Sequence, residues 1–252
     1  MKDKKTGLIQ TLIGAIILVI GIVLCVNTYI VKGNKAYAFS LLVTILGIVI
    51  LIAGLYRTFS KKERKPVDAK VIAQAALCAA LCYVGATFIK IDIPVGTERT
   101  MFHFGNVFCV LAALLIGGEW GGLAGAIGMT ISDLSTAYVT SAPKTFILKL
   151  CIGLIVGFVA HKLFHLSKEH SAKFATVVSS ICGMAFNIVA DPVVGYFYKT
   201  YLLGVPQDLA KTLAKIGAIT TSVNAVIAVI VASIIYLALR PAMKRLNMLR
   251  DL

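Results

Sequence analysis

The chain has 252 residues, of which 59% are hydrophobic and 14% are charged, and its mean hydropathy is +0.91. This composition excludes an ordinary soluble domain, because several apolar runs reach the roughly 18–20 residues that cross a ~30 Å hydrocarbon layer as a helix. The formal net charge of +14 indicates cytoplasmic loops of a membrane protein rather than a nucleic-acid surface, because no basic surface interleaved with aromatic residues is visible.

The hydropathy pattern predicts an all-α integral membrane protein with eight spans. The first two spans, residues 7–28 and 37–57, precede the most basic stretch of the chain, RTFSKKERKPVDAK. Its proline and charges are typical of a linker. We therefore expect residues 1–62 to form a transmembrane hairpin with a basic linker, separable from a folded, ligand-binding membrane domain at residues 63–252. The spans of that domain are expected at residues 70–90, 103–117, 119–137, 143–164, 174–198 and 213–239.

The distribution of cations predicts the orientation of the chain. With the N-terminus inside, most of the 25 Lys and Arg residues fall in inner segments, so the positive-inside rule places both termini in the cytoplasm. The outer loops of the six-span section are then IKIDIPVGTERTMFHFGN, STAYVTSAPKT and YKTYLLGVPQDLAKTLAK. They are chemically richer than the inner connections GGEWGG and HKLFHLSKEHSAK, which favours a site open to the exterior.

Two stretches of small residues indicate close helix packing. The run GGEWGGLAGAIG contains small-xxx-small pairs such as Gly117/Gly121 and Gly118/Gly122, which let helix backbones approach in lipid. The stretch AQAALCAALCYVGA contains the overlapping pairs Ala75/Ala79 and Ala76/Ala80. This second face fits either packing within the chain or docking of another membrane subunit.

Polar residues recur at a similar depth near the outer ends of several spans. His103 and Asn106 are three residues apart, so we expect them to share a helix face, where they serve either as structural hydrogen-bond groups or as ligand contacts. Asp133 ends one span and Lys144 and Lys149 begin the next. We expect an ion pair of Asp133 with Lys144 or Lys149 that pins two helices and presents charge to a ligand, because intramembrane charges are usually paired and face the interior.

The last two spans repeat this pattern. Asn187 and Asp191 are one helical turn apart in the outer half of their span, and Asn224 lies with Thr220 and Thr221 in the final one. Convergence of polar groups from several spans predicts a small-molecule cavity. The candidate substrate-binding residues are Arg99, His103, Asn106, Asp133, Tyr138, Lys144, Thr145, Lys149, Asn187, Asp191 and Asn224.

Signals for catalysis and for metal or cofactor binding are missing from the sequence. The six cysteines form no CxxC pair and no Cys/His cluster with ligand spacing. HExxH, GxSxG and GxxxxGK[ST] motifs are also missing. We therefore expect neither an enzyme nor a metal or cofactor site.

The stretch FHFGNVFCVLAALLIGGEWGGLAGAIGMTISDLSTAYVTSAPKTFILKLCIGLIVG resembles the central signature of S components of energy-coupling factor (ECF) transporters. The matching pattern is a His-x-Gly-Asp/Asn start, a Gly-rich turn, a Gly-x-x-x-x-Asp-Leu segment and an Ala-Pro-x-Thr-x-x-x-Lys helix start. The residues at these positions are His103, Gly105, Asn106, Gly128, Asp133, Leu134, Ala142, Pro143, Thr145 and Lys149. The resemblance covers roughly residues 70–240.

This resemblance implies a six-helix substrate-capturing subunit in the cell membrane, with an outward-facing pocket and an extra N-terminal hairpin. It implies a transmembrane coupling subunit, which docks on Ala75, Ala76, Ala79 and Ala80, and two cytoplasmic ATPase subunits that drive uptake. The substrate would be a vitamin or a precursor, and pyridoxine, pyrimidine precursors of thiamine and queuosine precursors are all open. The alternative is an autonomous secondary transporter, which would need inverted repeats and paired broken helices; no clear internal repeat is visible.

Overall fold

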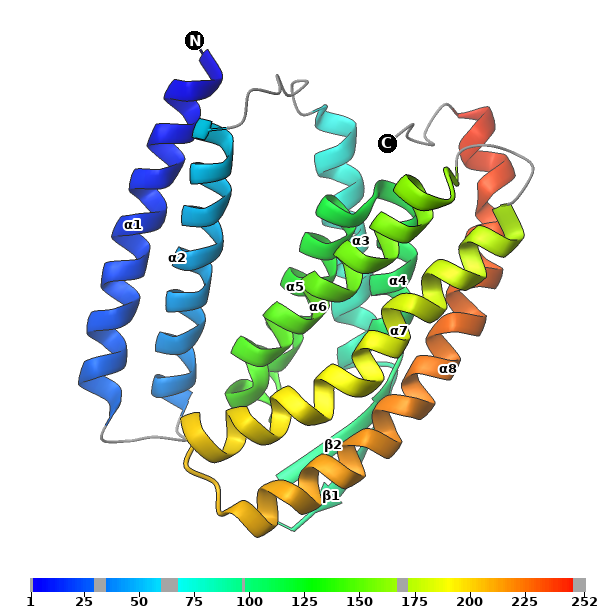
Figure 1. Ribbon diagram of the computed structural model, residues 1–252. Coiled ribbons are helices and arrows are strands. Elements are labelled where there is room, and N and C mark those ends of the chain that lie inside the picture. Colours follow the sequence, from blue (N-terminus) through cyan, green and yellow to red (C-terminus); the bar gives the residue numbers. More distant parts are fainter. Residues whose placement is uncertain (1, 30–34, 60–67, 97, 167–171, 247–252) are drawn as a thin grey trace.

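The computed structural model describes residues 2–29, 35–59, 68–96, 98–166 and 172–246. Within these ranges the chain forms eight α-helices and one β-hairpin (Figure 1). The helices are α1 (Lys2–Thr28), α2 (Lys35–Phe59), α3 (Ala69–Thr87), α4 (Gly105–Ile116), α5 (Gly118–Ser135), α6 (Ala142–Gly157), α7 (Ala172–Phe197) and α8 (Gln207–Arg245). The strands are β1 (Lys90–Val95) and β2 (Glu98–His103), and the short helical segments are η2 (Val139–Ser141), η3 (Phe158–Leu163) and η5 (Tyr198–Leu202).

The helical architecture confirms the predicted fold class, but the number of spanning helices differs from the prediction. Six helices in the described part of the chain are long and apolar enough to cross a membrane, rather than eight. The two exceptions are α4 and α5. Helix α4 has 12 residues, about 18 Å at 1.5 Å per residue, and α5 has 18 residues but interrupts its apolar sequence with glycines. The predicted boundary between residues 62 and 63 lies outside the described residues.

Helices α3 to α8 pack into one bundle around α4. Nearly every residue of α4 is buried, as expected of a helix that is apolar on all sides. Large side chains such as Leu114, Ile152, Met184 and Tyr236 fill the core between α4, α6, α7 and α8. Helix α1 begins and α8 ends at one end of the molecule, and the β-hairpin lies at the opposite end (Figure 1).

Glycines bring α5 into backbone contact with its neighbours, which confirms that the glycine-rich run serves helix packing. A Cβ atom on Gly153 of α6 would lie 2.2 Å from the Cα atom of Gly122. A Cβ atom on Gly128 would lie 2.1 Å from the carbonyl oxygen of Ala79 in α3. Any side chain at these positions would separate the helices, so the glycines determine how closely α3, α5 and α6 pack.

The α1–α2 hairpin is also built on glycines. Gly7, Gly14 and Gly21 recur every seven residues in α1, and Gly47 and Gly54 do so in α2. Each meets the opposite backbone; a Cβ atom on Gly14 would lie 2.4 Å from the amide nitrogen of Leu51. A seven-residue repeat keeps one face of a helix toward its partner over several turns, so the glycine spacing marks the faces on which α1 and α2 meet.

The loop predicted between the third and fourth spans is a β-hairpin. Strands β1 and β2 pair antiparallel from Lys90 opposite His103 to Val95 opposite Glu98. The chain turns at Gly96, whose φ of 61° lies in the left-handed region that glycine adopts without steric cost. The prediction that His103 shares a helix face with Asn106 is therefore wrong, because His103 ends β2 whereas Asn106 lies in the first turn of α4.

The small-residue face of α3 divides into two halves. Ala75 and Ala79 pack against α4 and α5 in a cluster with Cys78, Ala112 and Ala124. Ala76 and Ala80 are exposed on the outer surface of the bundle. The alanines thus serve packing within the chain on one side, and on the other Ala76 and Ala80 are exposed beside the larger exposed side chain of Leu77.

Candidate substrate cavity

A polar cavity lies at the hairpin end of the bundle, between β2 and helices α5, α6, α7 and α8. The cavity has a volume of ≈ 130 Å³. All the candidate substrate-binding residues line it: Arg99, His103, Asn106, Asp133, Tyr138, Lys144, Thr145, Lys149, Asn187, Asp191 and Asn224. The fold therefore brings these residues to one place, and their contact with a substrate stays a prediction.

Asp191 joins three helices on one side of the cavity. Lys144, in the first turn of α6 after Pro143, donates from Nζ to Asp191 Oδ1 at 2.8 Å. Thr221 of α8 donates its hydroxyl to Asp191 Oδ2 at 2.9 Å. Pro192 follows directly inside α7, where it has no N–H for the helix ladder. Both carboxylate oxygens are thus occupied, and the negative charge of Asp191 is matched by the ammonium of Lys144.

The expected ion pair of Asp133 with Lys144 or Lys149 is wrong. Asp133 instead accepts the hydroxyl of Thr145 at 2.5 Å, and Lys149 donates to Asn106 Oδ1 at 2.8 Å. Helix geometry explains this arrangement, because Lys144 and Lys149 are five positions apart and point about 140° away from each other. Lys144 therefore faces α7, whereas Lys149 lies under α4 and Thr145 faces α5.

Asn224 fastens the hairpin to α8. Its side-chain oxygen accepts the backbone N–H of His103 at 3.1 Å, and its amide nitrogen donates to the carbonyl of Met101 at 3.0 Å. The Asn224 amide thus acts like a neighbouring strand along β2. One turn earlier, the hydroxyls of Thr220 and Thr100 lie 2.9 Å apart. The Asn224 side chain therefore positions the hairpin over the cavity.

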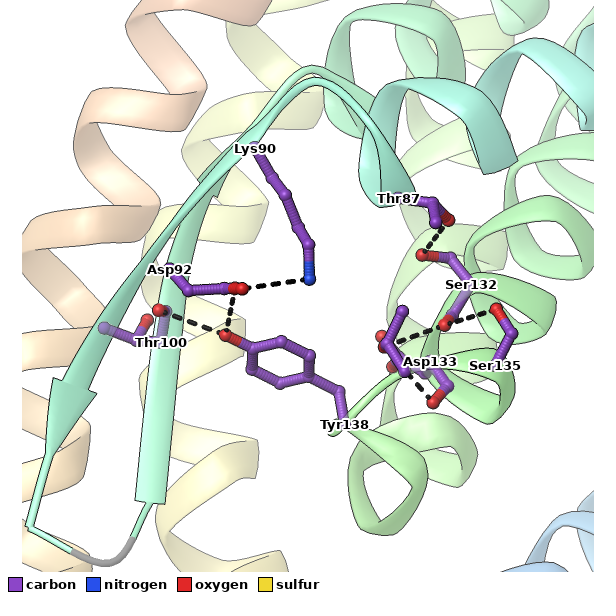
Figure 2. Close-up of polar contacts among 9 residues, drawn as sticks. Thr87, Lys90, Asp92, Thr100, Ser132, Asp133, Ser135 and Tyr138 are labelled. Carbon is purple, nitrogen blue, oxygen red and sulfur yellow. Dashed lines mark hydrogen bonds and ion pairs between the residues drawn. The ribbon is translucent and has the colours of Figure 1, made fainter.

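Tyr138 fastens the hairpin from the opposite side. Figure 2 shows its side chain reaching from the segment after α5 toward both strands. The hydroxyl donates to Asp92 Oδ1 at 2.8 Å and lies 3.2 Å from the Thr100 carbonyl oxygen. Lys90 pairs with Asp92 at 3.1 Å and lies 5.3 Å from the centre of the Tyr138 ring.

The electrostatics of the Tyr138 contact keep it in place. Burial raises the pKa of Asp92, but the hydrogen bonds from Tyr138 and Lys90 outweigh burial and leave the carboxyl pKa below its ordinary value. Burial, followed by the hydrogen bond to Asp92, raises the pKa of the Tyr138 hydroxyl. The phenol thus stays protonated as the donor and the carboxylate stays charged as the acceptor.

A buried side-chain oxygen in the cavity lacks a hydrogen-bond partner among the described residues. Asn187 is buried, and its Oδ1 atom accepts no hydrogen bond from the described residues. A buried polar group without a partner costs about 1–3 kcal/mol. Native structures keep such groups rarely, often where a ligand or water completes the set. Asn187 therefore offers a free acceptor to a molecule in the cavity.

Several lining residues were not among the candidates. Ser141, Gly195, Lys199 and Met101 also line the cavity. Lys199 belongs to the π-helix η5, whose extra residue per turn breaks the 3.6-residue spacing on which helix-face predictions rest. The hydroxyl residues of STAYVTSAPKT did signal a polar segment, although not which side chain would face inward.

Comparison with known proteins agrees with these features. The family described as "ECF-type riboflavin transporter, S component" matches residues 67–241. A Pyrococcus woesei protein described as an uncharacterized protein in a gap 3′ region is 32% identical over 75 residues, which is 30% of this chain and 50% of the relative. The chain thus aligns with half the length of this relative. No solved structure matches.

The family match starts just before α3 and ends within α8, so it contains the cavity and leaves out α1 and α2. It covers more than half of the chain, and the matched part carries the long apolar helices α3, α6, α7 and α8. The chain is therefore a multi-pass membrane transport protein that belongs to the family of ECF-type riboflavin transporter S components.

Proposed function

We propose that this chain captures a vitamin or vitamin-like molecule in the hairpin-end cavity and delivers it to an ATP-driven ECF importer. The observation that carries the proposal is the convergence of polar side chains from β2, α4, α5, α6, α7 and α8 on one cavity. Polar groups inside a membrane bundle are costly and mark substrate pathways. Most buried side chains elsewhere in the described bundle are apolar, so the buried charged groups Asp133 and Lys149 stand out at this cavity.

The chemistry of the cavity fits a flat polar ring system. Asn187 Oδ1 supplies a free acceptor. His103 accepts the Gly105 N–H through Nδ1 at 3.1 Å, so a neutral ring carries its proton on Nε2 and can donate to a ligand. Riboflavin presents both donors and acceptors at the edge of its ring, and the family description names it. We propose riboflavin as the first candidate, with pyridoxine and the thiamine and queuosine precursors as competitors.

The orientation follows from charge. Most Lys and Arg residues of the sequence fall in segments expected on the side at which α1 begins and α8 ends, and the positive-inside rule would assign that side to the cytoplasm. The cavity would then open to the outside of the cell membrane. This arrangement suits a subunit that takes up its substrate from the exterior.

The importer would supply the parts that this chain lacks in its sequence. No GxxxxGK[ST] motif is present, so two cytoplasmic ATPase subunits would provide the energy through a transmembrane coupling subunit. The exposed stripe of Ala76 and Ala80 on α3 is the proposed docking surface, because small residues permit close helix approach. The division of the chain into the hairpin at residues 1–62 and the substrate-binding domain at 63–252 belongs to the same proposal.

The test is direct binding to the purified full chain in detergent or nanodiscs. Riboflavin is fluorescent, so its quenching on titration would report the dissociation constant, and pyridoxine would be tested by competition. Saturable riboflavin binding supports the proposal; binding of pyridoxine alone would reassign the substrate within the family. Sustained uptake into proteoliposomes by this chain alone, driven by an ion gradient, would favour an autonomous secondary transporter instead.

A further inference from the structure

The wall of the cavity between α5 and α6 has a second side, which faces helix α2. We define this wall as residues 138–145, which include η2 and the first turn of α6. Tyr138, Ser141, Lys144 and Thr145 face the cavity. On the other side, the backbone carbonyl of Thr140 accepts a hydrogen bond from Tyr198. Phe146, which directly follows the wall, packs against Leu42 of α2.

Two apolar clusters join α2 to the back of this wall. In the first, Leu42 of α2 packs with Phe146 of α6 and Ala126 of α5, and Ile45 and Val49 extend the contact along α2. In the second, Tyr37 packs with Tyr198 and Leu203 at η5. Tyr37 and Leu42 are the buried α2 side chains of these contacts, 4% and 5% exposed, and Ile45 and Val49 are partly buried.

A hydrogen bond links the second cluster to the wall itself. The hydroxyl of Tyr198 donates to the backbone carbonyl of Thr140 in η2 at 2.8 Å. Tyr198 directly precedes Lys199, which lines the cavity. Tyr37 therefore packs against Tyr198, which connects η5 to η2. Each of these two segments also carries a side chain that lines the cavity, Lys199 in η5 and Ser141 in η2.

The wall needs such support because it is irregular. Between the end of α5 at Ser135 and the start of α6 at Ala142 the chain forms only the three-residue turn η2. On the far side, η5 is a short π-helix. The single turn of η2 leaves Tyr138 and Ser141 outside a regular α-helix, so side-chain contacts decide much of their placement. Lys199 lies in η5, whose backbone bonds run from the N–H groups of Leu203 and Val205.

We propose that the α1–α2 hairpin is a positioning element of the substrate cavity, in which Tyr37 and Leu42 hold the wall and η5 in their binding geometry. The hairpin lies outside the part of the chain that matches the family, so the family match alone assigns it no role. The expected effect on substrate affinity rests on the proposed function. The expected effect of the hairpin on the order of residues 138–145 does not depend on that function. Pre-organising a binding site raises affinity by reducing the ordering cost of binding.

The first experiment needs no ligand. Hydrogen–deuterium exchange is measured on the full chain in nanodiscs for the wild type, Tyr37→Ala and the matched control Phe39→Ala on the same helix, whose side chain is 53% exposed. Exchange in residues 138–145 should rise in Tyr37→Ala and stay at the wild-type level in Phe39→Ala. Equal exchange in the two variants overturns the proposal, whatever the substrate is.

The second experiment uses riboflavin as the probe. Tyr37→Ala and Leu42→Ala should weaken binding by about fivefold to tenfold through loss of pre-organisation, whereas Phe39→Ala and Ile52→Ala, on exposed positions of α2, should not. Tyr198→Phe removes only the hydroxyl bonded to Thr140 and should weaken binding more than Tyr201→Phe, whose ring is 64% exposed.

Hydrogen–deuterium exchange and riboflavin binding together show which of the two proposals has failed, the substrate or the positioning role of the hairpin. If riboflavin does not bind the wild type, the substrate proposal fails and the exchange experiment still decides whether the hairpin orders the wall. If riboflavin binds and the Tyr37→Ala and Leu42→Ala variants keep the wild-type affinity, the positioning role is overturned even when exchange rises.

Discussion

Lys144 and Asp191 form the direct ion pair of the cavity, 2.8 Å apart between Nζ and Oδ1, and the pair joins the first turn of α6 to α7 beside Pro192. Lys149, five residues further along α6, contacts the neutral side chain of Asn106 instead. Two lysines of one helix therefore have different electrostatic partners, and this difference can be measured.

Double-mutant cycles should distinguish the two lysines. Lys144→Met and Asp191→Asn should each lower the melting temperature, and the double variant should lose less than the sum, because removing one partner strands the other. Asp133→Asn and Lys149→Met, which share no direct bond, should show a smaller coupling energy than the Lys144–Asp191 cycle. Thermal unfolding of the purified variants checks both cycles. Equal coupling in the two cycles would contradict the pairing described here.

Asn187→Leu should weaken ligand binding without lowering the stability of the ligand-free protein. The substitution removes a buried acceptor that has no partner among the described residues, so the ligand-free protein should keep or gain up to about 1–3 kcal/mol. Ligand binding should weaken by about tenfold or more if Asn187 accepts a hydrogen bond from the substrate. Riboflavin titration and thermal unfolding are measured on the same samples.

The control for this experiment is Asn224→Leu. It breaks two hydrogen bonds that hold β2 on α8, so stability and binding should fall together. A loss of stability in Asn187→Leu with unchanged affinity would show that the Asn187 side chain is structural.

Gly128→Ala should destabilise the bundle strongly. Its new Cβ atom would lie 2.1 Å from the carbonyl oxygen of Ala79, so α3 and α5 must separate, and overpacking of this kind costs about 1–3 kcal/mol or more. Gly217→Ala is the matched control, because a Cβ atom there meets no other atom within 4 Å and alanine has the higher helix propensity, by up to about 1 kcal/mol. Thermal unfolding should rank Gly217→Ala at or above the wild type. The same melting temperature for both variants would argue against the tight α3–α5 contact.

Tryptophan substitutions on α3 should separate docking from internal packing. Ala76→Trp and Ala80→Trp lie on the exposed half of the helix, so they should abolish assembly with the coupling subunit and uptake while leaving riboflavin affinity unchanged. Ala79→Trp points into the bundle and should reduce folding and binding together. Uptake is measured in cells that co-express the coupling subunit and both ATPases. Normal uptake by Ala76→Trp and Ala80→Trp would mean that the coupling subunit docks elsewhere.

The sequence by itself determined that the chain is a helical membrane protein, and it identified many of the polar residues that surround the cavity, although not Ser141 and Lys199. Both follow from local properties, because a run of consecutive apolar residues defines a membrane helix and a polar side chain within such a helix must face the protein interior. Asp133, Lys149 and Asn187 could therefore be identified without knowing their neighbours, whereas His103 lies in strand β2 rather than in a membrane helix.

Only the tertiary structure decided which of these residues form hydrogen bonds and ion pairs with one another, and which residues of α2 pack against the outer side of the cavity wall. Partner choice depends on how each helix is rotated and how closely it packs, so Asp191 rather than Asp133 meets Lys144, and Asn187 Oδ1 is left without a partner in the described part of the chain. The hairpin that Asn224 and Tyr138 hold over the cavity, and the contact of Tyr37 with Tyr198, join residues far apart in the chain. Such pairings depend on long-range geometry that no local pattern of residues carries.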